Sequence, residues 1–324
     1  MDPTEPDLTW DAAAPLLVPL LSSTIFLGGL PAPLVRIRVA PFVHAYAAIT
    51  TGDLPRLVRP EDAGRWRRSF VELLARAVEN LDAEGLVIAR DEERDLLVMT
   101  APDGLASSRM LVPDLLPALV HADAEDIAFA IPEPNCVLVT SRANEDLDRL
   151  ARAAEAAFTK ASEPLSPAIY VFDAHAEGAF TELPNPRATA LLEVREHELQ
   201  RLALEELARD QGEDLLVAPL NLVSRGDAST ATAAVWARGA DGLLPCADLL
   251  FVAWPDEATP GATHVLMVRR EDLERALPGR LVRLASDYEP PLCAALGFPT
   301  EEELASLAEV AVATGWTDPS EQSE

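Results

Sequence analysis

The sequence contains little cysteine, almost no lysine and few aromatic residues. Cys136, Cys246 and Cys293 stand far apart, without a Cys-x-x-Cys pair. This odd, sparse cysteine content argues against a disulfide framework and favours a reducing compartment, so we expect a cytoplasmic protein. Lys160 is the only lysine among 26 basic residues. Together with abundant alanine and proline, this arginine preference is typical of a GC-rich bacterial genome.

A long apolar run is also missing. The apolar stretch 16–30 is interrupted by Pro19, Ser22 and Ser23. It is shorter than the ~20 residues that a membrane helix needs. No basic segment precedes it, as one would in a signal peptide. We interpret it as a buried segment and expect no contact with a membrane.

Several motifs of catalysis and cofactor binding are absent. The chain has no Gly-x-Ser-x-Gly elbow and no Gly-rich phosphate loop. His197 and Glu198 begin like a zinc-binding His-Glu-x-x-His helix, but Arg201 stands where the second histidine is needed. No other histidine lies at metal-ligand spacing from a cysteine or a second histidine. The sequence therefore predicts no catalytic residue, no cofactor and no metal site of a recognisable type.

Acidic residues are in large excess over basic ones. The chain carries 54 Asp and Glu against 26 Lys and Arg, a formal net charge of −28. Nucleic acids and anionic membranes both require a basic protein surface, so neither is an expected partner. A strongly acidic protein attracts basic proteins over a distance. The composition therefore favours another protein as the partner.

Length and hydrophobic patterning predict an α+β fold in two domains. The 324 residues, 49% of them hydrophobic, suffice for two cores. Periodicity predicts a half-buried strand over 34–40, with Val35, Ile37 and Val39 on one face, and a helix over 66–81. Further along the chain we predict hairpins around 86–99 and 127–139 and strands over 230–237 and 249–254. Thr300 and Glu303 form a capping-box pattern at the start of a last helix. We expect a first domain over 1–175, a linker over 173–188 and a second domain over 189–316, each an antiparallel sheet with helices packed on one side.

Short motifs in the first half resemble the YtpQ-like family, a bacterial family without an established activity. The helix end from Ala77 to Asn80 and Leu81 is similar to that family's Ala-x-x-Asn-Leu. Asp103-Gly104 followed by Ser108-Arg109 is similar to its Asp-Gly and Ser-Arg motif. Where the family has an aspartate in the strand pair near Pro132, this chain has Asn135. The resemblance covers about residues 25–175 and implies a relative, but no reaction.

The order of elements is also similar to that of type III secretion chaperones, which are acidic adaptors that bind extended segments of other proteins. This likeness concerns the order of helices and strands alone, and a shared fold does not carry function.

The motif residues Asn80, Asp103, Ser108 and Arg109 form a candidate ligand site. An acid, a hydroxyl and a guanidinium at a helix start would bind an anion or a carboxylate. The alternative is structural: Asp103-Gly104 as a turn, a serine as a helix cap, and a local ion pair for Arg109. Asn80 would then bond carbonyl groups at its helix end, instead of lining a pocket shared with Arg109.

A local excess of positive charge interrupts the acidic sequence and is a candidate docking face. Its members are all arginines near the predicted helix start: Arg56, Arg59, Arg65, Arg67 and Arg68. The leading hypothesis is a non-enzymatic protein-interaction module, such as an adaptor, chaperone or assembly component. The alternative is an enzyme of unrecognised type with a pocket around Asp103, Ser108 and Arg109. The sequence leaves the oligomeric state open.

Overall fold

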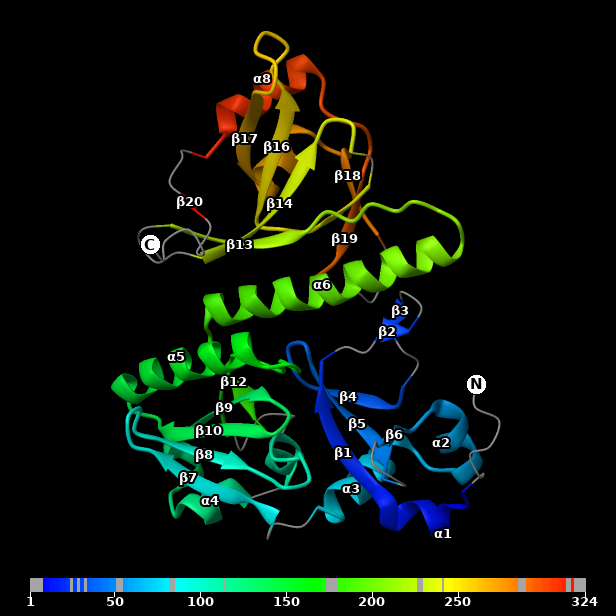
Figure 1. Ribbon diagram of the computed structural model, residues 1–324, viewed down its shortest axis with the longest axis vertical. Helices are drawn as coiled ribbons and strands as arrows, with labels where there is room; N and C mark the ends of the chain where they lie inside the picture. The colour runs from blue at the N-terminus through cyan, green and yellow to red at the C-terminus, as the bar shows by residue number, and fades with distance from the viewer. Residues whose placement is uncertain are drawn as a thin grey trace. The chain divides into compact units, whose positions relative to one another are not determined.

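The computed structural model divides the chain into two units, and Figure 1 shows their helices and strands. It describes residues 8–23, 26–27, 30–31, 34–50, 55–81, 85–112, 115–172, 180–225, 230–240, 242–284, 290–312 and 316–317. Unit 1 comprises residues 1–24 and 33–185, and unit 2 comprises residues 25–32 and 186–324. The α+β class predicted from the sequence is confirmed.

The division differs from the predicted one in an early segment and in the linker, since unit 1 continues to Asn185. Residues 25–32 belong to unit 2, where β2 (Phe26–Leu27) and β3 (Leu30–Pro31) pair and lie against helix α6 (Pro186–Asp210). Sequence periodicity cannot reveal that residues 25–32 belong to unit 2, because this assignment depends on tertiary contacts. The units separate between Asn185 and Pro186, inside the predicted linker 173–188, of which residues 173–179 lie outside the described residues.

Unit 1 begins with a small antiparallel sheet of order β1-β5-β4. Its strands are β1 (Leu17–Ser22), β5 (Val43–Ile49), β4 (Arg36–Ala40) and the short β6 (Arg56–Leu57), which pairs with β5. The short α1 (Trp10–Ala13) and η1 (Ala14–Leu16) precede β1. The predicted alternation of β4 is not kept, because this edge strand shifts register between Arg38 and Ala40, and Ile37 is 44% exposed.

The helix predicted over 66–81 is two helices. They are α2 (Pro60–Trp66) and α3 (Phe70–Glu79). Arg67 takes a left-handed φ of 52°, which ends α2. Ser69 then begins α3 with a capping box, in which its hydroxyl accepts from the Glu72 N–H. A pattern of apolar spacing continues across this break, so periodicity alone merges the two helices.

The second sheet of unit 1 has six strands, in the order β12-β11-β9-β10-β8-β7, and all its pairs are antiparallel. The strands are β7 (Val87–Asp91), β8 (Leu96–Thr100), β9 (Ile127–Glu133), β10 (Cys136–Ser141), β11 (Ile169–Val171) and β12 (Thr181–Glu182). The hairpins predicted around 86–99 and 127–139 are therefore confirmed.

Both faces of this sheet are covered at its centre. Helix α5 (Asn144–Lys160) packs Leu150 and Ala154 against one face. Figure 1 places α4 (Leu115–Val120) on the other side, and η3 (Ser107–Leu111) and η4 (Ala124–Asp126) lie in the same connection. Every residue from Ile127 to Pro132 is buried. The expected packing of helices on one side describes α5, but the unbroken apolar run of β9 needs cover on both faces.

Unit 2 is built on a five-stranded sheet of order β17-β16-β14-β13-β20. The strands are β13 (Leu220–Arg225), β14 (Thr230–Ala237), β16 (Leu249–Pro255), β17 (Thr263–Arg269) and β20 (Trp316–Thr317). Helix α6 packs on β13 and β14, while α7 (Arg270–Ala276) and α8 (Glu301–Val310) contact β17. The capping box predicted at Thr300 and Glu303 is present at the start of α8.

One strand pair of unit 2 departs from the antiparallel expectation. β14 and β16 run parallel. Their connection passes through β15 (Leu243–Pro245), which forms a separate three-stranded sheet with β19 (Leu292–Ala295) and β18 (Leu281–Arg283). A parallel pair needs a crossover connection, and the segment containing β15 supplies it.

Among the described residues, every helix is too short or too polar to cross a membrane. After Leu16, which ends η1, the apolar stretch 16–30 contains no helix where it is described. Its first half forms β1, in which buried and half-buried residues alternate.

The two faces of α3 allow a matched test of the core of unit 1. Leu73 is fully buried in that core, whereas Val71, two residues away, is 68% exposed. We expect Leu73→Ala to lower the free energy of unfolding by about 2–5 kcal/mol. Val71→Ala removes exposed surface and should change it by less than about 0.5 kcal/mol. Urea unfolding of both variants measures the difference, and equal values would contradict the packing described for α3.

Candidate functional site

Asn80 anchors the start of β1 to the end of α3. Its side-chain amide donates to the carbonyl oxygens of Ala14, at 2.7 Å, and Leu17, at 2.9 Å. Asn80 is also the C-cap of α3. It therefore bonds carbonyl groups, as the structural alternative expected, but those of a distant segment instead of its own helix.

Ser108 holds the other end of β1. Its hydroxyl accepts a hydrogen bond from the Leu21 N–H at 3.2 Å, and both residues are buried. The sequence suggested a serine cap for the following helix, but no side chain caps η3. Ser108 bonds a strand 87 residues away instead.

The guanidinium group of Arg109 forms an ion pair with the Asp103 carboxylate. The Arg109 side chain is 3% exposed, and Nη1 and Nη2 donate to the two Asp103 carboxylate oxygens at 2.9 and 2.8 Å. The hydrogen bond from Arg109 lowers the pKa of Asp103. Gly104, with φ of 76°, supplies the predicted turn. A Cβ on Gly85 would lie 2.7 Å from Arg109 Nη2, so a larger residue there would displace the guanidinium.

Asn135 is also used inside the fold. Its side-chain oxygen accepts from the Ala101 N–H at 2.8 Å, and the neighbouring Pro134 carbonyl accepts from the Ser107 N–H at 3.0 Å. These bonds fasten the β9–β10 turn to the connection after β8. An amide oxygen fills this acceptor position as a carboxylate oxygen would.

The candidate docking face is partly neutralised by its own helices. Arg56 pairs with Asp62 at 2.7 Å, with Arg65 3.8 Å from the same carboxylate. Arg68 pairs with Glu72 at 3.2 Å and lies over the Trp10 ring. Within the described part of the chain, only the exposed Arg59 and Arg67 of this face form no ion pair.

A pocket that the sequence analysis did not identify lies beside the β7–β8 hairpin of unit 1. It encloses ≈ 360 Å³. Its lining comes from β7, β8, the end of α4, η4, β9, β10 and the first turn of α5. The residues that line it are Arg90, Asp95, Leu96, Leu97, Val120, Ala122, Asp126, Ile127, Val139, Thr140, Ser141 and Asp146.

The floor of this pocket is apolar and its rim is acidic. Leu96, Ile127 and Val139 are each 2% exposed. Asp95, Asp126 and Asp146 contribute three carboxylates to the lining, against the single guanidinium of Arg90. The pocket lining therefore combines apolar side chains with three carboxylates and one guanidinium.

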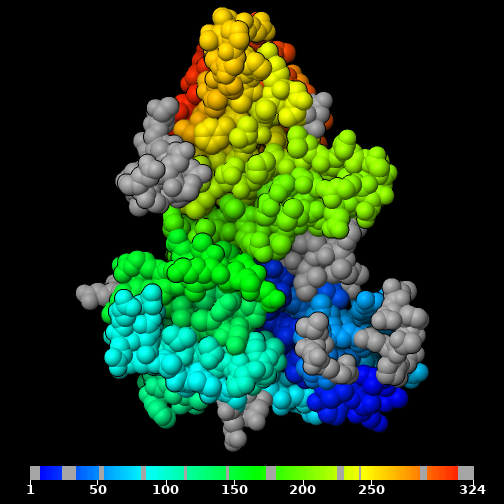
Figure 2. Space-filling view, viewed as in Figure 1, coloured from blue at the N-terminus to red at the C-terminus, as the bar shows by residue number. Residues whose placement is uncertain are grey.

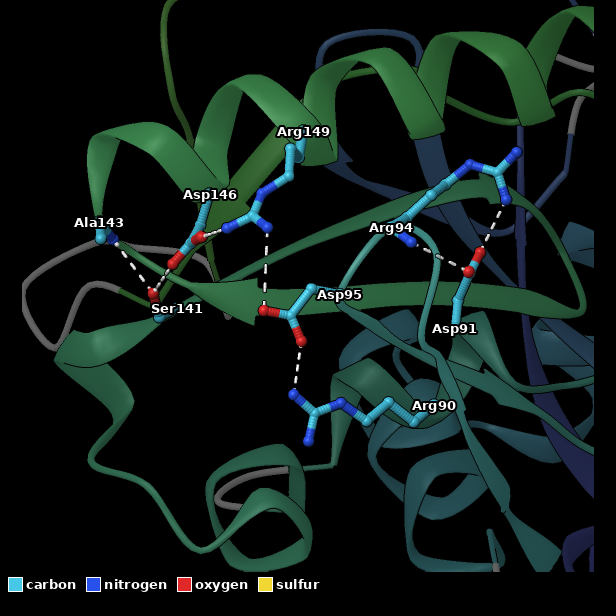
Figure 3. A network of polar contacts seen from close by, with 8 residues as sticks. All are labelled: Arg90, Asp91, Arg94, Asp95, Ser141, Ala143, Asp146 and Arg149. Atoms are coloured by element: carbon cyan, nitrogen blue, oxygen red, sulfur yellow. Dashed lines mark hydrogen bonds and ion pairs between the residues drawn. The ribbon is translucent and has the colours of Figure 1, made fainter.

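A network of ion pairs fixes two of the three carboxylates (Figure 3). Asp95, in a left-handed turn with φ of 52°, bonds Arg90 and lies 3.8 Å from Arg149 of α5. Asp146 bonds the Ser141 hydroxyl and Arg149, and these contacts lower its pKa. The network thus joins the β7–β8 hairpin to the start of α5.

Asp126 is the carboxylate that this network leaves available. It is exposed on the rim and forms no ion pair with the other described residues. In sequence, the signals for this pocket were the charged turn between β7 and β8 and the polar residues that follow β10. Neither signal shows that the two segments meet.

Comparisons with known proteins found no matching family model, curated protein or solved structure. The YtpQ-like resemblance therefore stays a prediction from the motifs.

We expect the Asp103–Arg109 pair to act on stability. Asp103→Asn removes the negative charge from the two-pronged contact with the buried Arg109 guanidinium and should lower the free energy of unfolding by about 1–3 kcal/mol at neutral pH. Because folding lowers the pKa of Asp103, its contribution is present above the ordinary carboxyl range and is lost as the pH falls through the folded-state pKa. Urea unfolding at neutral and acidic pH measures both effects.

The matched control for this prediction is Asp91→Asn. Asp91 pairs with the exposed Arg94 at the surface. Its loss should cost at most ~1 kcal/mol. An Asp103→Asn protein as stable as the wild type at neutral pH would contradict the structural role of the pair.

Proposed function

We propose that the protein is a protein-interaction module that binds a basic, partly apolar segment of another protein at the pocket beside the β7–β8 hairpin. The observation that supports this is the combination of an apolar floor with an acidic rim. An arginine or lysine side chain of the partner would place its carbon stem on the floor and its charge beside Asp126. The net charge of −28 would speed the approach of such a partner.

The edge strand next to the pocket supports an extended partner segment. β7 is the last strand of its sheet, and Val87 and Ile88 on it are 54% and 40% exposed. Figure 2 shows the β7–β8 hairpin at the surface of unit 1. An edge strand presents unpaired backbone groups to which a second chain can add as a further strand. Side chains of an added strand would then lie close to the pocket.

The biological setting belongs to the same proposal. The arginine-rich composition and the thiols of Cys136, Cys246 and Cys293 favour a bacterial cytoplasm. An adaptor, chaperone or assembly component fits an acidic protein of this element order. The exposed Arg59 and Arg67 offer a second, oppositely charged face on unit 1.

The alternative, an enzyme with a pocket around Asp103, Ser108 and Arg109, has less support. Arg109 donates to Asp103, and the Ser108 hydroxyl accepts from the backbone of β1. A ligand would have to displace these contacts before it could bind there.

The acidic rim is tested by charge reversal at Asp126. The probes are extended synthetic peptides of equal apolar content whose net charge varies from basic to acidic. We expect the basic peptides to bind, and Asp126→Arg to weaken their binding about tenfold, close to 1.4 kcal/mol. Glu125→Arg is the matched control, because this exposed neighbour does not line the pocket and its reversal changes the net charge equally. Equal weakening by both reversals, or preference for acidic peptides, would refute the proposed site.

The edge strand is tested by Ile88→Lys. Lysine on an edge strand is a device by which natural proteins block strand addition. We expect the variant to lose most of its affinity for the basic peptides while keeping its circular dichroism spectrum. Val71→Lys, on the exposed face of α3, makes the same chemical change away from β7. If both lysine variants bind like the wild type, the partner does not use β7.

A further inference from the structure

We propose that Cys246 and Cys293 form a dithiol–disulfide pair, a redox modification site in unit 2 that is independent of the peptide site. The two sulfur atoms lie 2.7 Å apart, although the residues are 47 positions apart in the chain. The sequence had suggested isolated thiols, because their separation conceals the pairing of β15 with β19.

The backbone places the two thiols together. Leu244 on β15 pairs with Cys293 on β19, and the Cys246 N–H donates to the Pro291 carbonyl at 2.9 Å. Cys246 follows the last residue of β15 directly, and its bond to Pro291 keeps it beside the start of β19. The meeting of the sulfurs therefore follows from strand register.

The two thiols differ in access, which assigns them different tasks. Cys293 is 3% exposed, whereas Cys246 is half-buried and is the more accessible residue of the two. Cys246 is the thiol that meets an external oxidant. Cys293 is the thiol that completes the bond from inside.

The charges around the pair favour a thiolate on Cys246. A hydrogen bond from Cys293 and the guanidinium groups of Arg270 and Arg283 lower the pKa of Cys246 to about 7, against the opposing effects of burial and of Glu274. The pKa of Cys293 is raised, because its thiol donates to Cys246 and is buried. Arg270 Nε is buried without a hydrogen-bond partner among the described residues.

Oxidation by a small-molecule disulfide completes the chemistry in two exchange steps. The Cys246 thiolate attacks one sulfur of the reagent, whose S–S bond breaks, and one reagent thiolate leaves. The Cys293 thiol gives its proton to the departing second reagent thiolate and attacks the Cys246 sulfur. Two cysteine thiols are thereby oxidised by two electrons to one disulfide, and one reagent disulfide is reduced to two thiols.

The bond would enclose much of unit 2. The segment between the two cysteines contains β16, β17, α7 and β18. Leu244, two residues before Cys246, and Ala247, directly after it, belong to the core cluster that includes Trp236. Closing so long a loop restricts the unfolded chain, so the oxidised protein should melt several degrees higher than the reduced one.

The experiment titrates the full chain with oxidised and reduced glutathione. We expect the wild type to lose two thiols together and the mass of two hydrogen atoms, with the bond mapped to Cys246 and Cys293 by peptide mass spectrometry. Cys136→Ser should behave identically, because Cys136 belongs to unit 1. Cys293→Ser should stop at a mixed disulfide between Cys246 and glutathione.

The rate of alkylation gives a second readout in the reduced protein. Burial raises the pKa of Cys136 to about 11, so this residue is an internal reference. At neutral pH we expect Cys246 to react with iodoacetamide roughly tenfold faster than Cys136. The alkylation rate of Cys246 should rise as the pH passes about 7, because its thiol ionises there. Arg270 and Arg283 lower that pKa, and Glu274 opposes them.

A wild-type protein that accumulates glutathione on Cys246 while Cys293 stays reduced would overturn the proposal. So would a disulfide that forms equally often with Cys136.

Discussion

Two side chains, those of Asn80 and Ser108, hold the first sheet of unit 1 in place by hydrogen bonds to the backbone of β1 and of the η1 turn before it. Asn80 donates to the carbonyl groups of Ala14 and Leu17, and Ser108 accepts from an N–H near the end of β1. Each bond joins segments more than 60 residues apart. Buried backbone groups need hydrogen-bond partners, and a substitution that leaves one of them unpaired destabilises the fold by about 1–3 kcal/mol. Asn80 and Ser108 therefore stabilise the fold through these hydrogen bonds.

The pair of Asp103 and Arg109 extends the same arrangement. A buried guanidinium is tolerated because a carboxylate meets it in a two-pronged contact. Gly85 makes room for it where any side chain would collide. Ligand sites and structural contacts use the same residue types. The sequence therefore left both the ligand-site and the structural interpretation of this cluster open.

The acidity of the chain takes on a local meaning in the structure. Many carboxylates neutralise nearby arginines, as Asp62 does on the candidate docking face and Asp146 does in the first turn of α5. Asp126 differs, since it stands on the rim of an apolar pocket without an ion pair in the described part of the chain. Net charge describes how a partner approaches, whereas a single unengaged carboxylate next to carbon surface describes where it would bind.

The sequence by itself determined what depends on neighbouring residues. Period-two spacing located the hairpins of unit 1 and strands β14 and β16, and a short motif located the capping box at Thr300. Each of these signals depends on residues that are close together in the chain. Only the tertiary structure decided the break at Arg67, the exchange of residues 25–32, the pocket beside β7 and the meeting of Cys246 with Cys293. Three of these depend on which distant segments pack together, and the break at Arg67 depends on one backbone angle that apolar spacing does not record. Strand register and crossover connections set those contacts, and neither leaves a periodic signal in the chain.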